Sequence, residues 1–255
     1  KPLPSDDKLP HAANFLWQLQ GMKPDMEMAR DLDVCLLLHA DHTFNASTFA
    51  CREVVSTRAH LYAGVAAGLA ALSGDLHGGA NARVMKMLFE LESVDDIAGW
   101  VSQKLDRGEK IMGLGHAVYK TMDPRAKFIR EMSRRLGEKT GRKKWHDLSV
   151  YLEKTALNEL EKRGKSGVQP NVDFCSGPLY HIMGIPRDLM TPLFAIARMA
   201  GWCAHIIEEK FGDAQKKPAL YRPKSEYVGQ YCGMMGCKYE PRQKKGEVFG
   251  QSLTV

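Results

Sequence analysis

The chain has 255 residues, of which 44% are hydrophobic and 26% charged, so it can bury the core of one large or two modest domains. The formal net charge of +6 favours anionic partners, but no run of Lys and Arg is interleaved with aromatic residues, which argues against nucleic-acid binding. The most apolar run, residues 61–72, is too short to cross a bilayer, and no signal peptide is evident. We therefore expect a cytoplasmic protein with neither nucleic-acid nor membrane partners.

The cysteines are scattered, and most stand in apolar surroundings, which is typical of buried free thiols in a reducing compartment. Cys232 and Cys237 form the only close pair in the sequence, and no second Cys or His pair accompanies them. A structural zinc site is therefore not expected.

Hydrophobic spacing predicts helices along nearly the whole chain and no strands. A first helix should cover residues 13–19 and end at Gly21, and Pro24 should open a second. Asn45 is expected to cap one long helix that continues to about Ser73. Its second half, residues 63–71, has small residues all round, so we expect it to be buried against neighbours or across a subunit interface.

The central part of the chain is more charged than its flanks, which predicts a smaller, more solvated lobe inserted into a larger helical one. The further expected helices are one ending near Leu91, one with a Ser93–Asp96 capping box that Gly108 stops, a basic helix over 124–136, one with Leu148, Leu152, Ala156, Leu157 and Leu160 on one face, and a last one over 186–211. Residues 137–144 are predicted to be a charged surface loop, and residues 171–177 a polar interruption between helices.

The stretch from Gly113 to Arg125 combines the features of an anion-binding loop. Two glycines flank Leu114, which permits a sharp turn and a close backbone approach to a ligand. His116 and Lys120 follow, and Asp123-Pro124 is typical of the start of a helix. Helix N-termini and cationic side chains both favour negative charge, although a plain surface loop would have the same sequence.

Three other polar stretches, residues 39–42, 77–81 and 171–177, interrupt the apolar pattern, and functional groups often lie on such loops. The candidate groups on all four stretches are His42, His77, His116 and Asp173, with Arg125, Arg198 and Arg222 from the neighbouring segments. Arg198 stands in an apolar helix and requires an anionic partner if buried. Alternatively, Asp173 only caps a helix, one of His39 and His42 belongs to the core, and His60, His181 and His205 are structural.

Several histidines, one carboxylate and several arginines suit a substrate that bears carboxylates, which arginine binds in a bidentate manner. A carboxylate base takes a proton from carbon if a neighbouring donor stabilises the resulting enolate. A second histidine can polarise an electrophilic carbonyl. Together, these groups are the ones that a condensation reaction forming a carbon–carbon bond requires.

Five motifs, in this order over nearly the whole chain, resemble the citrate synthase family. They are His39-Ala-Asp-His-Thr-Phe-Asn-Ala-Ser47, Leu76-His-Gly-Gly-Ala-Asn81, Gly113-Leu-Gly-His-Ala-Val-Tyr-Lys120 with Asp123-Pro-Arg125, Asn171-Val-Asp-Phe-Cys-Ser-Gly177 and Tyr221-Arg-Pro-Lys-Ser225. The resemblance implies an all-α fold with a large domain, whose N-terminal part is missing here, and an inserted small domain. The implied boundaries are 1–76 and 184–255 for the large domain and 77–183 for the small one.

By this resemblance the protein would be an acyltransferase of the tricarboxylic acid cycle that condenses acetyl-CoA with oxaloacetate and water to citrate and CoA. Asp173 would be the base, His77 the donor to the thioester oxygen and His116 the group that polarises the keto carbonyl. The implied substrate-binding residues are His42, Arg125, Arg198, Phe194 and Arg222, the last from the other subunit of a homodimer. Gly113, Leu114, Gly115 and Lys120 would hold CoA, the small domain would close over the substrates, and no metal or other cofactor is implied.

Other functions stay open at this stage. A 2-methylcitrate synthase, which uses propionyl-CoA, would share the catalytic set, and citryl-CoA lyase runs related chemistry in reverse. An HD-type metal phosphohydrolase would require His42, His146-Asp147 and Asp173 as metal ligands, although Asp147 is better explained as a helix cap. A non-catalytic basic helical scaffold would leave the grouping of His, Asp and Arg unexplained.

Overall fold

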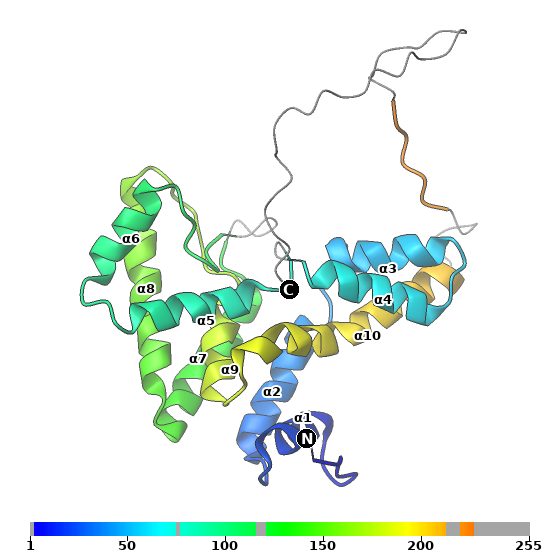
Figure 1. Cartoon of the computed structure of the whole chain (residues 1–255), viewed down its shortest axis with the longest axis horizontal. Helices are drawn as coiled ribbons and strands as arrows, with labels where there is room; N and C mark the ends of the chain where they lie inside the picture. The colour runs from blue at the N-terminus through cyan, green and yellow to red at the C-terminus, as the bar shows by residue number, and fades with distance from the viewer. Residues whose placement is uncertain (1–2, 75–76, 116–120, 213–219, 227–255) are drawn as a thin grey trace, which may run out of the picture. The chain divides into compact units, whose positions relative to one another are not determined.

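A computed structural model describes residues 3–74, 77–115, 121–212 and 220–226, and the elements in these ranges are helices joined by turns and loops (Figure 1). The helices are α1 (His11–Gln20), α2 (Met26–His39), α3 (Ala46–Ser56), α4 (Leu61–Leu72), α5 (Ala80–Leu91), α6 (Ile97–Asp106), α7 (Pro124–Thr140), α8 (Lys143–Lys162), α9 (Val172–Ile182), the 3-10 helix η1 (Arg187–Leu189) and α10 (Met190–Phe211). The only β-type pairing within these ranges is an isolated bridge between Leu114 and Pro170, so the predicted all-α class is confirmed.

The long helix predicted from Asn45 to Ser73 is wrong: the chain turns after α3 and returns as α4. Asn45 does cap α3, because its side chain accepts a hydrogen bond from the N–H of Thr48. The turn includes Arg58 with a positive φ of 71°, and His60 caps α4 by accepting from the N–H of Ala63. Figure 1 shows the two helices side by side. Periodicity alone missed this turn because it contains neither proline nor glycine.

The small residues of α4 serve the contact with α3 and α10 within the chain. A Cβ atom on Gly64 would lie 2.7 Å from Cγ1 of Val55, and one on Gly68 would lie 2.3 Å from Sγ of Cys51. The opposite face is exposed within this chain, with Leu69 47% accessible, so neighbours within the chain bury only one side of the helix, and burial across a subunit interface stays a prediction.

Three other predicted boundaries differ from the structure. The α7 helix continues to Thr140 and ends at Gly141, which has a φ of 69°. Gly137 lies inside this helix and lets the start of α8 pack closely on it, since a Cβ on Gly137 would lie 3.0 Å from Cα of Lys143. Residues 172–177 belong to α9 rather than to a loop. Asp96 caps α6 by itself, by accepting from the N–H of Gly99.

Helix α10 is central to the part of the chain before residue 222 and contacts α2, α3, α4 and α5. By length and composition alone, the 25 residues of Arg187–Phe211 could cross a membrane. The helix nevertheless carries the buried charged side chains of Arg198 and Glu209, and its Trp202 is fully buried against α3 and α4. These features are those of a core helix.

The described residues form two apolar cores, and Trp202 belongs to the smaller one. The remaining helices share the larger core, in which α9 packs against α5, α7 and α8. Glycine again permits close packing, since a Cβ on Gly177 would lie 3.0 Å from the carbonyl oxygen of Asn81. This core also includes α1 and α2, so it continues across the boundary predicted at residues 76 and 77. The division into 1–76, 77–183 and 184–255 stays a prediction.

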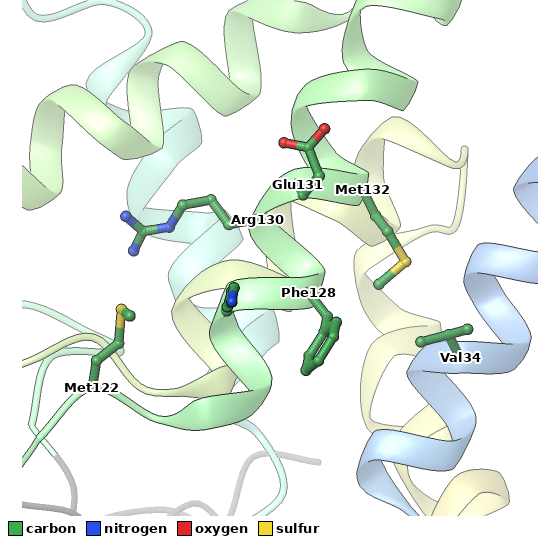
Figure 2. A pocket seen from close by; sticks show the side chains of 7 residues that line it. Val34, Met122, Phe128, Arg130, Glu131 and Met132 are labelled. Carbon is green, nitrogen blue, oxygen red and sulfur yellow. The ribbon is translucent and has the colours of Figure 1, made fainter.

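Ion pairs join α2 to α7, on the two sides of that predicted boundary. Arg135 pairs with Glu27 and, at 2.6 Å, with Asp31, while Lys139 lies 2.6 Å from Asp25 and 2.7 Å from Glu27. A hollow of about 610 Å³ lies beside them, and Figure 2 shows Val34, Phe128 and Met132 around the gap between the two helices.

We predict that Gly68→Ala lowers the free energy of unfolding by about 1–2 kcal/mol. Overpacking a core costs typically 1–3 kcal/mol, and the helix propensity of alanine returns at most ~1 kcal/mol. The new methyl group would meet Sγ of Cys51 and, at 3.1 Å, the ring of Trp202. Chemical denaturation measures the change, with Gly74→Ala as the control, because the nearest atom to a Cβ there is 3.4 Å away. Equal stability of the two variants would contradict this packing.

Candidate active site

Most of the predicted site residues lie in the described part of the chain. His116 and Lys120 lie outside it, and Arg222 begins a second compact unit, of which the structure describes residues 222–226. The structure therefore reports on the positions of His42, His77, Gly113, Leu114, Gly115, Arg125, Asp173, Phe194 and Arg198.

His77 is held by the N-terminus of α3. The backbone N–H of Ser47 donates to Nε2 of His77 at 3.2 Å, and Oγ of Ser47 lies 2.8 Å from the same nitrogen. Ser47 is itself fixed, because its hydroxyl donates to Oδ1 of Asn45 and accepts from Nε1 of Trp202. These contacts bring together residues that are 30 positions apart in the sequence.

The contact with Ser47 decides which nitrogen of His77 carries the proton. A backbone N–H can only donate, so the contact with the N–H of Ser47 favours the neutral ring with its proton on Nδ1, whereas the contact with the Ser47 hydroxyl is compatible with either tautomer. Burial, and then the positive charge of Arg198, lower the pKa of His77. His77 is therefore a neutral imidazole at neutral pH, and the backbone contact favours Nδ1 as its donor nitrogen.

Asp173 lies in the first turn of α9. The side chain of Asn171 caps this helix by accepting from the N–H groups of Asp173 and Phe174, at 3.0 and 3.2 Å. The carboxylate of Asp173 is only slightly exposed, and burial raises its pKa to about 6 against the opposing positive charges of Arg125 and Arg198. It is thus an ionised but poorly solvated carboxylate at neutral pH, which suits a general base.

The glycine loop that precedes His116 is fastened to the same end of α9. Gly115 donates its N–H to the carbonyl of Gln169, and Asn171 donates its N–H to the carbonyl of Gly113 and its side-chain amide to that of Gly115. Gly113 has a φ of 81°, and a Cβ there would lie 2.7 Å from Cβ of Phe174. Only glycine fits this close approach, so the loop and Asp173 hold a fixed relation to each other.

Arg198 is 2% exposed and lies between α10 and the end of α2. Its Nε donates to the carbonyl oxygen of His39 at 2.7 Å, and its guanidinium stacks 4.9 Å from the ring centroid of Phe194. No carboxylate of the described residues lies within ion-pair distance of it, and burial lowers its pKa to about 10. The anionic partner that such a buried cation requires is therefore not supplied by the described part of the chain.

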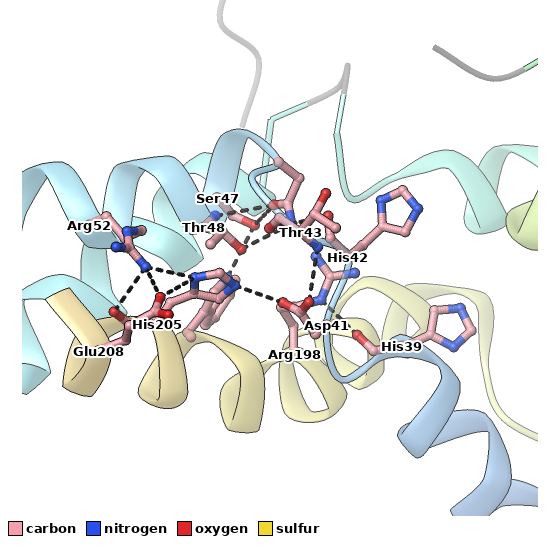
Figure 3. Close-up of polar contacts among 12 residues, drawn as sticks. His39, Asp41, His42, Thr43, Ser47, Thr48, Arg52, Arg198, His205 and Glu208 are labelled. Carbon is pink, nitrogen blue, oxygen red and sulfur yellow. Dashed lines mark hydrogen bonds and ion pairs between the residues drawn. The ribbon is translucent and has the colours of Figure 1, made fainter. Parts of the chain in front are cut away.

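His39 belongs to the same cluster, which bears out the expectation that one histidine of the 39–42 stretch is a core residue. It is 1% exposed, its Nδ1 donates to the carbonyl of Cys35 at 2.8 Å, and its ring meets that of Phe194 edge to face at 5.0 Å. Figure 3 shows the rings of His39 and His42 on the same side of the view, away from Arg52. Burial lowers the pKa of His39 to about 4, so this ring is neutral.

Arg125 is oriented by the residue that caps its helix. Its Nε and Nη2 donate to the two carboxylate oxygens of Asp123 at 3.0 and 2.7 Å, and Asp123 is buried. The charges of Arg125, Arg198 and Asp123 all act on Asp173 and on His39, so these side chains form one electrostatic cluster. The cluster offers two arginines, one carboxylate base and neutral histidines around a single region.

Sequence reasoning assigned no role to Ser47 or Asn171, and it gave Asp123 only as a helix start and His39 only as a possible core residue, although all four lie within or beside the quoted motifs. Ser47 and Asp123 each orient a predicted site residue, and Asn171 links the glycine loop to α9. The sequence signal that could have pointed to these four residues was their position within or directly beside the candidate motifs. The metal-site alternative gains no support, because no group of three or more His, Cys, Asp or Glu side chains in the described ranges could hold a metal ion.

The chain is similar to known citrate synthases. A family model described as citrate synthase, C-terminal domain, matches residues 1–224. The citrate synthase of Haloferax volcanii is 45% identical over 88% of this chain and 57% of its own length. Among solved structures, citrate synthase from Pyrobaculum aerophilum superposes on this chain with a TM-score of 0.81 at 37% sequence identity. The match covers 96% of this chain and 58% of the Pyrobaculum chain.

A second solved structure is the ternary complex of carboxymethyl coenzyme A and oxaloacetate with citrate synthase from Thermoplasma acidophilum. It has a TM-score of 0.79 at 34% identity and covers 96% of this chain and 61% of that one. A 2-methylcitrate synthase from Corynebacterium glutamicum is also 39% identical over 86% of this chain. The chain spans somewhat more than half the length of the relatives it matches.

We predict that Asp173→Asn stabilises the fold at neutral pH. Because the pKa of Asp173 is raised from 3.8 to about 6, the folded state binds more protons than the unfolded state between these values. Stability is therefore lost as the pH rises through this window, by up to about 3 kcal/mol at ~1.4 kcal/mol per pKa unit. Chemical denaturation at pH 4, 5, 6 and 7.5 should give a stability difference in favour of Asn that grows with pH. A variant less stable than wild type at pH 7.5 would contradict the raised pKa.

Proposed function

The chain belongs to the citrate synthase family, and on that premise we propose that the protein condenses acetyl-CoA with oxaloacetate and water to give citrate and CoA. The observation that carries the proposal is that the charge of Arg198 acts both on His77, a neutral histidine, and on Asp173, a poorly solvated carboxylate whose pKa is raised to about 6. A base and a neutral donor are the two groups that enolisation of a thioester needs.

In the proposed first step, the carboxylate of Asp173 takes a proton from the methyl group of acetyl-CoA. The electron pair of the broken C–H bond forms the enol double bond, and Nδ1–H of His77 stabilises the charge that develops on the thioester oxygen. A neutral imidazole suits this role, because the pKa of His77 is held low by burial and by Arg198. Gly113, Leu114, Gly115 and Lys120 are the proposed CoA-binding residues.

In the proposed second step, the enol carbon attacks the keto carbon of oxaloacetate, the thioester carbonyl forms again, and the keto oxygen takes up a proton to become the hydroxyl of the product. We assign the polarisation of this keto group to His116, and the binding of the keto acid to His42, Arg125, Arg198, Phe194 and Arg222. No carboxylate of the described residues forms an ion pair with Arg198, although the charges of Asp41 and Asp173 act on it, and this supports the assignment because a substrate carboxylate would complete its surroundings. Water then hydrolyses the citryl thioester and releases CoA.

We propose further that the protein is a homodimer and that Arg222 enters the site of the partner subunit. The exposed face of α4, which includes Tyr62 and Leu69, supports a packed interface on that side. The proposed chemistry uses only side chains and substrates, so neither a metal nor another cofactor is part of it. The 2-methylcitrate synthase alternative uses the same groups, and comparing turnover of acetyl-CoA and propionyl-CoA by the full-length protein distinguishes the two.

We expect Asp173→Asn to abolish citrate formation while oxaloacetate binds nearly as well as in wild type. The amide cannot take the methyl proton, whereas the arginines that hold the keto acid are unchanged. Enzyme assays measure the first effect and calorimetry with oxaloacetate the second. Arg125→Ala is the comparison, because it should weaken oxaloacetate binding by about tenfold or more, as loss of a charged hydrogen-bonding partner does. Equal weakening by both substitutions would refute this division of roles.

A further inference from the structure

A buried ion-pair network ties the C-terminal half of α10 to α3. The guanidinium of Arg52 on α3 is 8% exposed, and its Nη2 lies 2.6 Å from Oε2 of Glu209, whose side chain is 1% exposed. Nη1 of Arg52 pairs with the more exposed Glu208. Breaking a buried pair of this kind leaves an uncompensated charge, so the network fixes the relative position of the two helices.

One end of this network holds Tyr221, the residue directly before Arg222. The hydroxyl of Tyr221 donates to Oε2 of Glu209 at 2.7 Å, the same oxygen that meets Arg52. The ring of Tyr221 stacks on Phe49, with centroids 6.1 Å apart and planes 6° apart. Its backbone N–H donates to Oγ of Ser56 at 3.2 Å. Three contacts of different kinds thus fix the last residue before Arg222.

The other end holds Asp41, the residue directly before His42 (Figure 3). Nη1 of Arg52, which can only donate, lies 3.0 Å from Nδ1 of His205, so Nδ1 accepts and Nε2 is the donor nitrogen of the ring. That Nε2 donates to Oδ1 of Asp41 at 3.1 Å, and Oδ2 of Asp41 accepts from the N–H of Thr43. The turn that carries His42 is therefore linked to Tyr221 through His205, Arg52 and Glu209.

We propose that Tyr221 is a positioning residue for oxaloacetate binding: the network formed by Asp41, His205, Arg52, Glu209 and Tyr221 fixes the residue that directly precedes Arg222 and thereby the contribution of Arg222 to binding. This inference rests on the proposed function and on the substrate-binding role assigned to Arg222. It holds for whichever subunit's site receives Arg222, because every contact of the network lies before residue 222.

The test is a double-mutant cycle of Tyr221→Phe and Arg222→Ala in the full-length protein, with the dissociation constant of oxaloacetate measured by calorimetry. Tyr221→Phe removes only the hydroxyl that meets Glu209 and keeps the ring on Phe49. We expect it to weaken oxaloacetate binding about fivefold, the typical effect of one hydrogen bond. We expect no further weakening when it is added to Arg222→Ala, because Tyr221 acts through Arg222.

A purely structural role of Tyr221 would weaken binding by the same factor in both backgrounds, and that result, or no weakening at all, would overturn the inference. Tyr151→Phe is the matched control, because Tyr151 lies on α8 with 54% exposure, and it should leave the dissociation constant unchanged. Citrate formation by the wild-type protein is assayed separately. If it occurs and the cycle is additive, only the positioning role fails, whereas its absence refutes the proposed function as well.

Discussion

The backbone N–H of Ser47, at the start of α3, donates to Nε2 of His77, and the proposed chemistry depends on this contact. It favours the neutral tautomer with the proton on Nδ1, and the positive end of the α3 dipole further disfavours a charged ring. The contact exists because α3 begins at Asn45, whose side chain also accepts from the hydroxyl of Ser47. A helix cap, which at first concerns only local stability, thus sets the protonation state of a proposed catalytic residue.

Charge balance in the cluster explains how a base and two cations coexist. Burial raises the pKa of Asp173, while Arg125 and Arg198 lower it, and the result of about 6 leaves the carboxylate ionised at neutral pH. A dianionic keto acid bound to the arginines would offset their charge, so we expect Asp173 to become more basic once oxaloacetate is bound. The same charges that bind the first substrate would thereby prepare the base for the second.

Sequence reasoning predicted the all-α class and brought His77, Asp173 and the arginines onto one list of candidates, because each stands in a local polar motif. It missed the turn between α3 and α4, since Arg58 adopts its positive φ without a glycine signal. It also missed the support of His77 by Ser47, because that contact spans 30 residues and depends on how α3 packs on α10. Tertiary contacts of this kind leave no periodicity in the sequence.

The tautomer of His77 tests the account most directly. Nitrogen-15 NMR of the full-length protein with labelled histidine distinguishes the neutral Nδ1–H ring, the neutral Nε2–H ring and the imidazolium, and His77→Gln assigns the signal. We predict that His77 is the Nδ1–H tautomer at pH 7 and that it stays neutral down to pH values below the ordinary histidine pKa of ~6.5. A ring that is protonated on Nε2, or charged at pH 7, would contradict the proposed donor to the thioester oxygen.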